Sequence, residues 1–596
     1  MAMIKSRHPV GVLSWYHVVL VLGMLVGSAL GGKHKFEKDQ KIILWANKVG
    51  PFSSPTETYQ YFDLPFCQPK TKDNKPLTLG EVVDGNRMIA TQYDVSFRVD
   101  KEKMSLCKRK LSSDDLAAFR KAVSKDYYFQ FVFDDLPVWG YVGKTEKDAN
   151  GNIQKILLFT HFNFDLAYND DRVIEINIST DPTKVADISE GVQEANVEFT
   201  YSVSWKETHV KFSQRMDKYR KYQFLKHHLD IHWFSIINSF VTVMLLTGFL
   251  ATIFMRVLKK DFLKYAVDEE EVEDMEESGW KFVHGDVFRF PIHKSLFCAF
   301  AGTGLQVLVL TFFVFGLALI GTFYPYNRGA MFTALIVLYA LTAGCAGYTS
   351  ASYFKQMEGK KWVRNLLLTI GVFCGPLLVV FAFNNSVAWV YGSTAALPVG
   401  TIIIMILIWL LVSAPLTIIG GVLGKNAKVD FAAPCRTNKY PREIPDLPWY
   451  RSTIPQVIMA GFLPFSAIYI ELYYIFASIW SLKVYTLYSI LFIVFCILLV
   501  VTAFVTIALT YFQLTAEDHR WWWRSYMCGG STGLFVYGYA IYYFYAKSDM
   551  SGFMQTAFYF GYNFIVCYAL FLLLGFVGWR ASLAFVRRIY RAIKCE

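Results

Sequence analysis

The sequence predicts a membrane protein in which an N-terminal lumenal β-sandwich-like domain is followed by a nine-helix transmembrane bundle. Of its 596 residues, 54% are hydrophobic and only 18% are charged, whereas soluble domains average about 25% charged residues. Nine apolar blocks are long enough to cross a bilayer, which takes about 20 residues of helix. Lysines and arginines are concentrated in alternate loops between these blocks, which indicates a fixed orientation in the membrane.

Residues 1–31 are predicted to be a signal peptide. Lys5 and Arg7 form a basic start, residues 10–26 are largely apolar, and small residues that suit cleavage follow. An uncleaved signal anchor is the alternative. It would add a tenth span and place both chain ends in the cytosol.

Residues 32–230 are predicted to form a lumenal β-rich domain. Apolar and polar residues alternate over 197–206 and over 174–178, which is the period of a half-buried strand. Further β-rich runs are bounded by turn-forming residues, and this pattern favours an antiparallel sandwich. A helix is expected at 113–124, where a serine can cap its start. His161 lies in a strand-like run and is predicted to have a structural role.

Two covalent features are predicted in this domain. Cys67 and Cys107 are its only cysteines, and such a pair in an oxidising compartment is expected to form a disulfide. Asn177-Ile178-Ser179 is an acceptor sequence for N-glycosylation. Asn177 is therefore a candidate glycosylation site.

The first predicted span covers residues 233–255, which contain no ionisable side chain. Arg256, Lys259 and Lys260 follow it. Because positively charged residues next to a span stay in the cytosol, the C-terminal end of this span is predicted to be cytosolic and the preceding domain lumenal. The other eight blocks cover approximately residues 296–323, 329–352, 365–384, 394–422, 455–480, 485–514, 526–546 and 555–579.

The loop charges agree with nine spans. Loops assigned to the cytosol hold 24 lysines and arginines, and the opposite loops hold only Arg328, Lys483 and Lys547. The transmembrane domain is therefore predicted at 231–585 and a cytosolic tail at 586–596. The net charge of +11 lies mainly in these short loops, which indicates membrane lipids, and not nucleic acid, as the partner.

The sequence contains none of the common catalytic motifs. Zinc-protease, nucleophile-elbow, phosphate-loop and paired-cysteine motifs are absent, and no pair of membrane-embedded aspartates is found. We therefore expect no enzymatic activity, no cofactor and no metal.

Glu471 is the one charged residue in the middle of an apolar span. Because a charge at that depth is costly, such a residue is a candidate functional site. It could bind a proton or cation for transport, hydrogen-bond to a client protein's transmembrane helix, or be a protonated carboxyl bonded to a neighbouring helix. Pro376, Pro415 and Pro464 could break their spans, and discontinuous helices would favour transport.

The cytosolic stretch Arg520-Trp521-Trp522-Trp523-Arg524 is predicted to be an interfacial anchor. Tryptophans prefer the level of the lipid head groups, and arginines next to them can reach the phosphates. A partner-binding site is the alternative.

Four stretches carry a resemblance that extends over essentially the whole chain. They lie at 49–67, 279–289, 434–450 and 517–525, and they include the strings VGPF, GWK, PCRTNKYPREIP and EDHRWWWRS. On these motifs the chain resembles the nonaspanins, the transmembrane nine superfamily.

The resemblance implies a lumenal β-rich domain, nine membrane helices, and residence in Golgi and endosomal membranes. Nonaspanins are linked to the sorting and surface delivery of other membrane proteins, so client transmembrane proteins are implied partners. Lys594-Cys595-Glu596 resembles the Lys-x-Asp/Glu terminus of Golgi residents that the coatomer coat retrieves, which makes Lys594 and Glu596 a candidate coat-binding signal. The rival hypothesis is an ion or small-molecule transporter or channel that uses Glu471.

Overall fold

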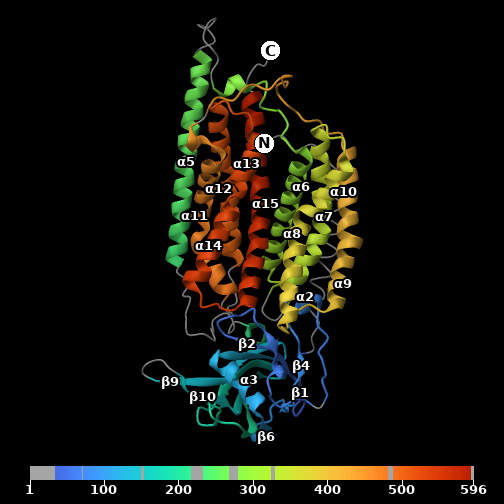
Figure 1. Ribbon diagram of the computed structural model, residues 1–596, viewed down its shortest axis with the longest axis vertical. Coiled ribbons are helices and arrows are strands. Elements are labelled where there is room, and N and C mark those ends of the chain that lie inside the picture. Colours follow the sequence, from blue (N-terminus) through green and yellow to red (C-terminus); the bar gives the residue numbers. More distant parts are fainter. Residues whose placement is uncertain are drawn as a thin grey trace.

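The computed structural model describes residues 34–69, 71–148, 153–216, 233–267, 279–323, 329–446, 448–480 and 488–591. The β-domain, residues 34–216, stands against one end of a bundle of long helices (Figure 1). The predicted signal peptide lies outside the described residues, and so do Lys594 and Glu596 of the candidate coat-binding signal.

Two sheets form most of the β-domain. One contains β3 (Tyr59–Gln60), β2 (Leu44–Pro51), β7 (Tyr127–Phe133) and β8 (Leu136–Tyr141) in that order, and β4 (Ile89–Ala90) also pairs with β2. The other has the order β12 (Arg172–Thr180), β11 (His161–Asn169), β14 (Ala195–Glu207) and β6 (Lys101–Leu111). Smaller sheets pair β1 (Lys41–Ile42) with β5 (Val95–Ser96), and β10 (Ile153–Phe159) with β9 (Gly143–Lys147) and β13 (Val185–Asp187).

Strand β14 shows how the alternating sequence produces a half-buried strand. Val197, Phe199, Tyr201 and Val203 are buried, and the residues between them are more exposed. One pairing differs from the expected antiparallel sandwich, because β11 and β14 run parallel. The chain between them includes β12 and β13, which makes it long enough for the crossover that parallel neighbours require.

Helix α3 (Ser113–Ser124) covers the residues for which a helix was expected. The Ser112 side chain accepts a hydrogen bond from the Asp115 N–H, and the Asp115 carboxylate accepts one from the Ser112 N–H. This capping box fixes the start of the helix. Phe119 of α3 is fully buried and packs edge to face against Phe66, so the helix closes one side of the core.

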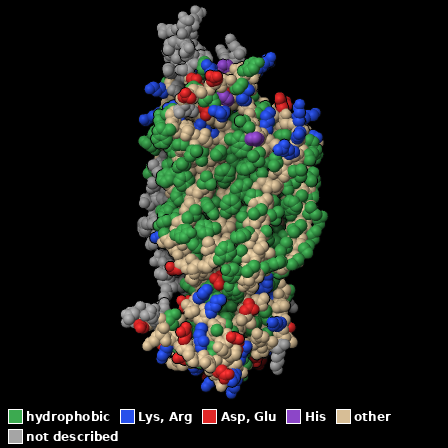
Figure 2. All heavy atoms as spheres, viewed as in Figure 1, with side chains coloured by type: hydrophobic (Ala, Val, Ile, Leu, Met, Phe, Trp, Pro, Cys, Tyr) green, Lys and Arg blue, Asp and Glu red, His purple; other side chains and the backbone are tan. Residues whose placement is uncertain are grey.

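Seven helical segments among the described residues are long and apolar enough to cross a membrane. They are α6 (Lys294–Ile320), α7 (Ala330–Gln356), α8 (Trp362–Val390), the run of α9 (Val399–Ile408), η5 (Trp409–Ser413) and α10 (Ala414–Asn426), α11 (Thr453–Ile479), α12 (Tyr488–Thr515) and α15 (Phe553–Arg591). The two remaining predicted blocks correspond to α5 (Trp233–Val267) and to α13 (Trp521–Gly530) with α14 (Thr532–Lys547). Figure 2 shows an apolar band between two charged ends, as expected for a surface that faces lipid.

The prolines do not break their helices as the sequence allowed. Pro376 and Pro464 lie inside the continuous helices α8 and α11. The π-helical turn η5 precedes Pro415, which has no N–H to donate to the preceding helical turn. Helical structure nevertheless continues from α9 through η5 into α10.

Helix α15 lies between two groups of helices (Figure 1). It contacts α6 and α8 in one group and α12, α13 and α14 in the other. Within the first group, α7 and α10 approach very closely: a Cβ atom added to Gly347 would lie 1.9 Å from the Thr417 carbonyl oxygen. Small residues permit the close van der Waals contact that holds helices together in lipid.

Polar contacts join the β-domain to the ends of the membrane helices. The Thr58 carbonyl accepts hydrogen bonds from the Ser393 hydroxyl (2.7 Å) and from the Thr394 N–H (2.9 Å), both in the α8–α9 loop. The Thr56 N–H donates to the Gln555 side chain at the start of α15 (3.1 Å). The short helix α2 (Leu79–Val83) also packs against α7. The β-domain is thus held at three places: the α8–α9 loop, the start of α15, and α7.

Candidate functional site

Glu471 is buried in α11 among apolar side chains. Its exposed fraction is 6%, and its neighbours Ile468 and Leu472 share a hydrophobic cluster with Phe495 and Leu498 of α12. Glu471 lies eight positions before the last residue of α11, which corresponds to about 12 Å of helix. Glu471 therefore lies in the half of the span nearer the β-domain and not at its centre.

The structure describes no hydrogen bond or ion pair of the Glu471 carboxyl group. The hydrogen bond to a neighbouring helix that was considered above is therefore not formed among the described residues. A polar group in apolar surroundings without a partner is destabilising. The group can take up a proton, hold a cation, or accept a hydrogen bond from another molecule.

The described part of the chain contains no group of three or more His, Cys, Asp or Glu side chains that could hold a metal ion.

A second polar cluster lies at the helix ends opposite the β-domain. We call it the polar cap, and it consists of residues 279–289, 434–445 and 517–525. The buried Asp286 carboxylate accepts hydrogen bonds from the Arg289 guanidinium (2.6 Å) and from the Arg442 N–H (3.3 Å). Arg289 also donates to the Asn438 carbonyl (2.9 Å). Three of the four stretches that carry the family resemblance thus meet in one cluster.

The structure corrects the prediction of an interfacial anchor at 520–524. Trp521 and Trp522 are only 0% and 2% exposed, so they do not lie among lipid head groups. The Trp521 indole N–H donates to the Val287 carbonyl (2.8 Å), and the Trp522 ring packs against Phe297 and Trp579. Contacts with α6 and α15 therefore replace the lipid contacts that the composition suggested.

The remaining residues of this stretch divide between the interior and the surface. Trp523 is partly buried and donates to the Ile292 carbonyl (2.8 Å). Arg524 is buried and pairs with Asp518 at 3.0 Å, whereas the side chain of Arg520 is 68% exposed. Of the five residues, Arg520 is the most exposed.

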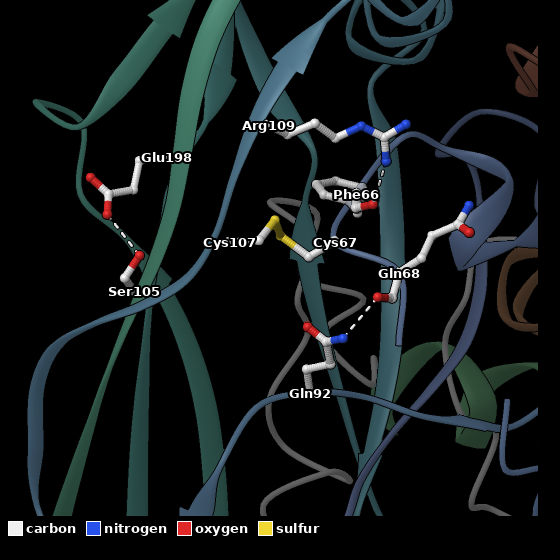
Figure 3. Close-up of a disulfide and its surroundings, with 8 residues drawn as sticks. All are labelled: Phe66, Cys67, Gln68, Gln92, Ser105, Cys107, Arg109 and Glu198. Atoms are coloured by element: carbon white, nitrogen blue, oxygen red, sulfur yellow. Dashed lines mark hydrogen bonds between the residues drawn. A yellow bond between two sulfur atoms is a disulfide. The ribbon is translucent and has the colours of Figure 1, made fainter. Parts of the chain in front are cut away.

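The structure contains the predicted disulfide between Cys67 and Cys107 (Figure 3). Cys107 lies on β6, and the bond ties this strand to the segment that follows β3 and η2 (Tyr61–Asp63). Two hydrogen bonds flank it: the Arg109 guanidinium donates to the Phe66 carbonyl (3.0 Å), and the Gln92 amide donates to the Gln68 carbonyl (2.8 Å). The bond therefore secures the segment after η2 against β6.

Asn177 and His161 occupy contrasting positions in the same sheet. Asn177 is exposed on β12, so a glycan at its amide would meet no obstacle from the protein core. His161 on β11 is 1% exposed, and its ring nitrogens bond to the hydroxyl of Thr200 (2.7 Å) and to the side-chain oxygen of Asn163 (2.8 Å). Burial lowers the pKa of His161 below its ordinary value.

The structure also contains a cavity that sequence reasoning missed. It measures about 430 Å³ and lies between the β-domain and the first turn of α9, with Lys72, Lys75, Arg87, Pro398 and Thr401 among its lining residues. The basic composition of residues 70–75 is a visible signal in the sequence. Their contact with residues more than 300 positions away could not be predicted.

Taken together, the apolar helices and the attached β-domain define a multi-pass membrane protein. The chain belongs to the endomembrane protein 70 family, the transmembrane nine superfamily, because the family model matches residues 58–553 and the relatives below match nearly the whole chain. The resemblance seen in the four motifs is thereby confirmed.

The similar proteins include transmembrane 9 superfamily member 3 of Arabidopsis thaliana, which is 60% identical over 97% of this chain and 99% of its own length. Transmembrane 9 superfamily member 1 of Bos taurus is 45% identical over 98% of each chain. A Dictyostelium discoideum protein named "Putative phagocytic receptor 1b" is 46% identical over 98% of this chain and 99% of its own. No solved structure matches the chain.

Proposed function

We propose that this protein is a non-enzymatic sorting factor of Golgi and endosomal membranes that binds other membrane proteins and directs their delivery to the surface. Membership of the transmembrane nine superfamily supports this proposal, and one relative carries the name of a phagocytic receptor. A protein that engages membrane clients needs a recognition element within the membrane, on the β-domain, or on both.

The proposal includes a topology of nine spans. In addition to the seven helices described above, α5 and the α13–α14 pair cross the membrane, with the β-domain in the lumen and the polar cap in the cytosol. The loop charges support this arrangement, since the loops that the sequence assigns to the cytosol hold 24 lysines and arginines and the opposite loops hold three.

The observation that carries the proposal is the carboxyl group of Glu471, which lies in an apolar helix and for which the structure describes no partner. Polar side chains contribute to helix–helix recognition in lipid because hydrocarbon offers them no other partner. A hydroxyl, amide or basic group on a client helix would satisfy this carboxyl.

The continuity of the helices favours sorting over transport. Transporters commonly build their ion sites from discontinuous helices whose unwound backbone coordinates the ion. Glu471 lies instead in a helix that runs without interruption from Thr453 to Ile479, through Pro464. The residues around Glu471 thus lack the exposed backbone carbonyls that would help it to bind a cation.

Three substitutions at Glu471 separate the two functions. Glu471→Gln keeps hydrogen-bonding capacity and removes ionisation, Glu471→Leu removes both, and Tyr469→Phe on the opposite face of α11 is the matched control. We expect normal client delivery with Gln and Tyr469→Phe and loss of delivery with Leu, at equal protein levels and location. Loss of delivery with Gln would indicate an ionisable transport site, and normal delivery with Leu would exclude Glu471 from client binding.

Retention is proposed to depend on a coatomer-type signal formed by Lys594 and Glu596. Such a terminus offers one ammonium group and two carboxylates at fixed spacing, which a protein pocket can recognise by charge-assisted hydrogen bonds. Appending two alanines after Glu596 moves the terminal carboxylate and keeps every native side chain. This variant should move to later compartments, and its tail peptide should lose coatomer binding; unchanged Golgi overlap and binding would reject the signal.

A further inference from the structure

The cavity between the β-domain and α9 combines positive charge with a position at the membrane surface. Its volume of about 430 Å³ lies within the range of small-ligand sites. One wall comes from the β-domain segment that contains Lys72 and Arg87, and another from Pro398 and Thr401 at the start of α9. Figure 1 shows α9 at the outer edge of the helix bundle, with α2 and β4 of the β-domain at its end.

The charge of this cavity is only partly compensated. No carboxylate is among the described residues that line it. Lys75 pairs with Asp135 at 3.1 Å, outside the lining set, and Asp63 lies near enough to Lys72 to interact electrostatically. Arg87 has no carboxylate partner among the described residues, so the cavity retains positive charge.

Arg87 is held in place by neutral groups. Its guanidinium donates hydrogen bonds to the carbonyl oxygens of Asn86 and Ala396, each 2.8 Å long. The second bond crosses from the β-domain to the α8–α9 loop. These bonds fix the guanidinium at the boundary between the β-domain and the membrane helices. Because both acceptors are neutral carbonyl groups, they do not neutralise its positive charge. A fixed arginine of this kind is well suited to bind a phosphate through two parallel hydrogen bonds.

The membrane side of the cavity continues into an apolar surface on α9. Thr401 and Ile404 share one side of α9, because residues three positions apart lie on the same face of a helix. Ile404 is 50% exposed, and Leu407, one turn further along, is 45% exposed. A lipid whose acyl chains lie against this surface would place its head group at the level of Thr401 and the cavity.

We propose that the cavity binds the phosphate group of an anionic phospholipid in the leaflet next to the β-domain. Arg87 and Lys72 contact the phosphate, the Asn74 and Gln60 amides that also line the cavity contact the polar head, and the acyl chains follow α9. Bound there, the lipid touches both the β-domain and the membrane helices and thereby strengthens the contact between them.

Binding of phosphatidylserine to the purified full-length protein in neutral detergent tests the proposal. We expect the double variant Lys72→Gln with Arg87→Gln to bind fluorescent phosphatidylserine at least about tenfold more weakly than the wild type. Lys121→Gln with Lys125→Gln is the matched control, because it removes two exposed charges from α3 and its end that do not line the cavity. Lys72→Gln alone removes the charge of an exposed residue for which the structure describes no hydrogen bond, and it should weaken binding with little change in thermal stability.

Two competing ligands identify what the cavity recognises. Phosphatidylcholine, which has no net charge, should displace the probe only at much higher concentration than phosphatidylserine. Water-soluble glycerol 3-phosphate should compete weakly, because it lacks the acyl chains. Equal competition by phosphatidylcholine, equal competition by glycerol 3-phosphate, or wild-type affinity in both cavity variants would each overturn the proposal.

Discussion

The guanidinium of Arg524 lies 3.0 Å from the carboxylate of Asp518, and both side chains are buried, with exposed fractions of 7% and 8%. The Gln513 amide donates to the same carboxylate (3.0 Å), and Arg524 also donates to the Arg451 carbonyl at the end of η6 (Trp449–Arg451). This ion pair therefore connects α12, α13 and the segment before α11. It is the centre of the hydrogen-bond network on that side of the polar cap.

Removing one partner of this pair should destabilise the protein strongly. Arg524→Ala leaves the Asp518 carboxylate buried without its partner, and such changes cost about 3–5 kcal/mol. Arg520→Ala is the matched control, because the side chain of Arg520 is mostly exposed, and surface ion pairs contribute at most about 1 kcal/mol. Thermal unfolding in detergent measures both. An Arg524→Ala protein as stable as Arg520→Ala would show that the pair does not hold the cap together.

The Cys67–Cys107 bond should stabilise the β-domain. It closes a loop with a sequence separation of 40 residues, which corresponds to about 4 kcal/mol in the chain-entropy model. Cys67→Ser with Cys107→Ser should therefore lower the denaturant midpoint of the β-domain. Thiol labelling of the denatured but unreduced protein should leave both cysteines unmodified, and stoichiometric labelling of both would reject the bond.

Stability of the β-domain should fall in mild acid because of His161. Burial lowers the pKa of the folded-state imidazole below its ordinary value of 6.5. The unfolded chain therefore takes up the proton first as the pH falls. The full stability contribution is present above about pH 6.5 and is lost as the pH falls through the folded-state pKa.

Replacing His161 should remove this pH dependence. His161→Gln retains hydrogen-bonding groups for Thr200 and Asn163 and cannot titrate. The difference between the unfolding temperatures at pH 7.5 and pH 5 should be smaller in this variant than in the wild type. Equal differences in the two proteins would show that other groups control the acid response.

A glycan on Asn177 would report the side of the membrane on which the β-domain lies. Asn177 is exposed on β12, and N-glycosylation requires a lumenal acceptor. Glycosidase treatment should increase the gel mobility of the wild type, and Asn177→Gln and Ser179→Ala should each abolish that change. A glycosidase-sensitive change that persists in both variants would place the glycan elsewhere.

The sequence predicted those features that depend on local periodicity and composition. Alternation identified β14, the serine cap identified α3, and apolar length identified the seven helices that meet the criterion for a membrane span. The parallel pairing of β11 with β14 was not predictable, because it depends on the path of the intervening chain and not on the pattern within either strand.

The candidate sites also divide into those that a local sequence pattern predicted and those that depend on contacts between distant residues. Sequence singled out Glu471, since a lone charge in an apolar block is visible without a structure. It misplaced Trp521 and Trp522, because lipid head groups and an aromatic protein core favour the same side chain, and only their packing against α6 and α15 distinguishes the two. The cavity at Arg87 was invisible because its walls come from residues far apart in the chain.

Comparison of the surface and Golgi proteomes after deletion tests the central claim, sorting of membrane proteins, most directly. Cells that lack the protein should lose a defined set of transmembrane proteins from the surface and retain them in internal membranes. Re-expression of the wild type should restore them, while the ion content of Golgi and endosomes stays constant throughout. A surface proteome that is unchanged by deletion, together with altered ion content, would contradict sorting and favour transport.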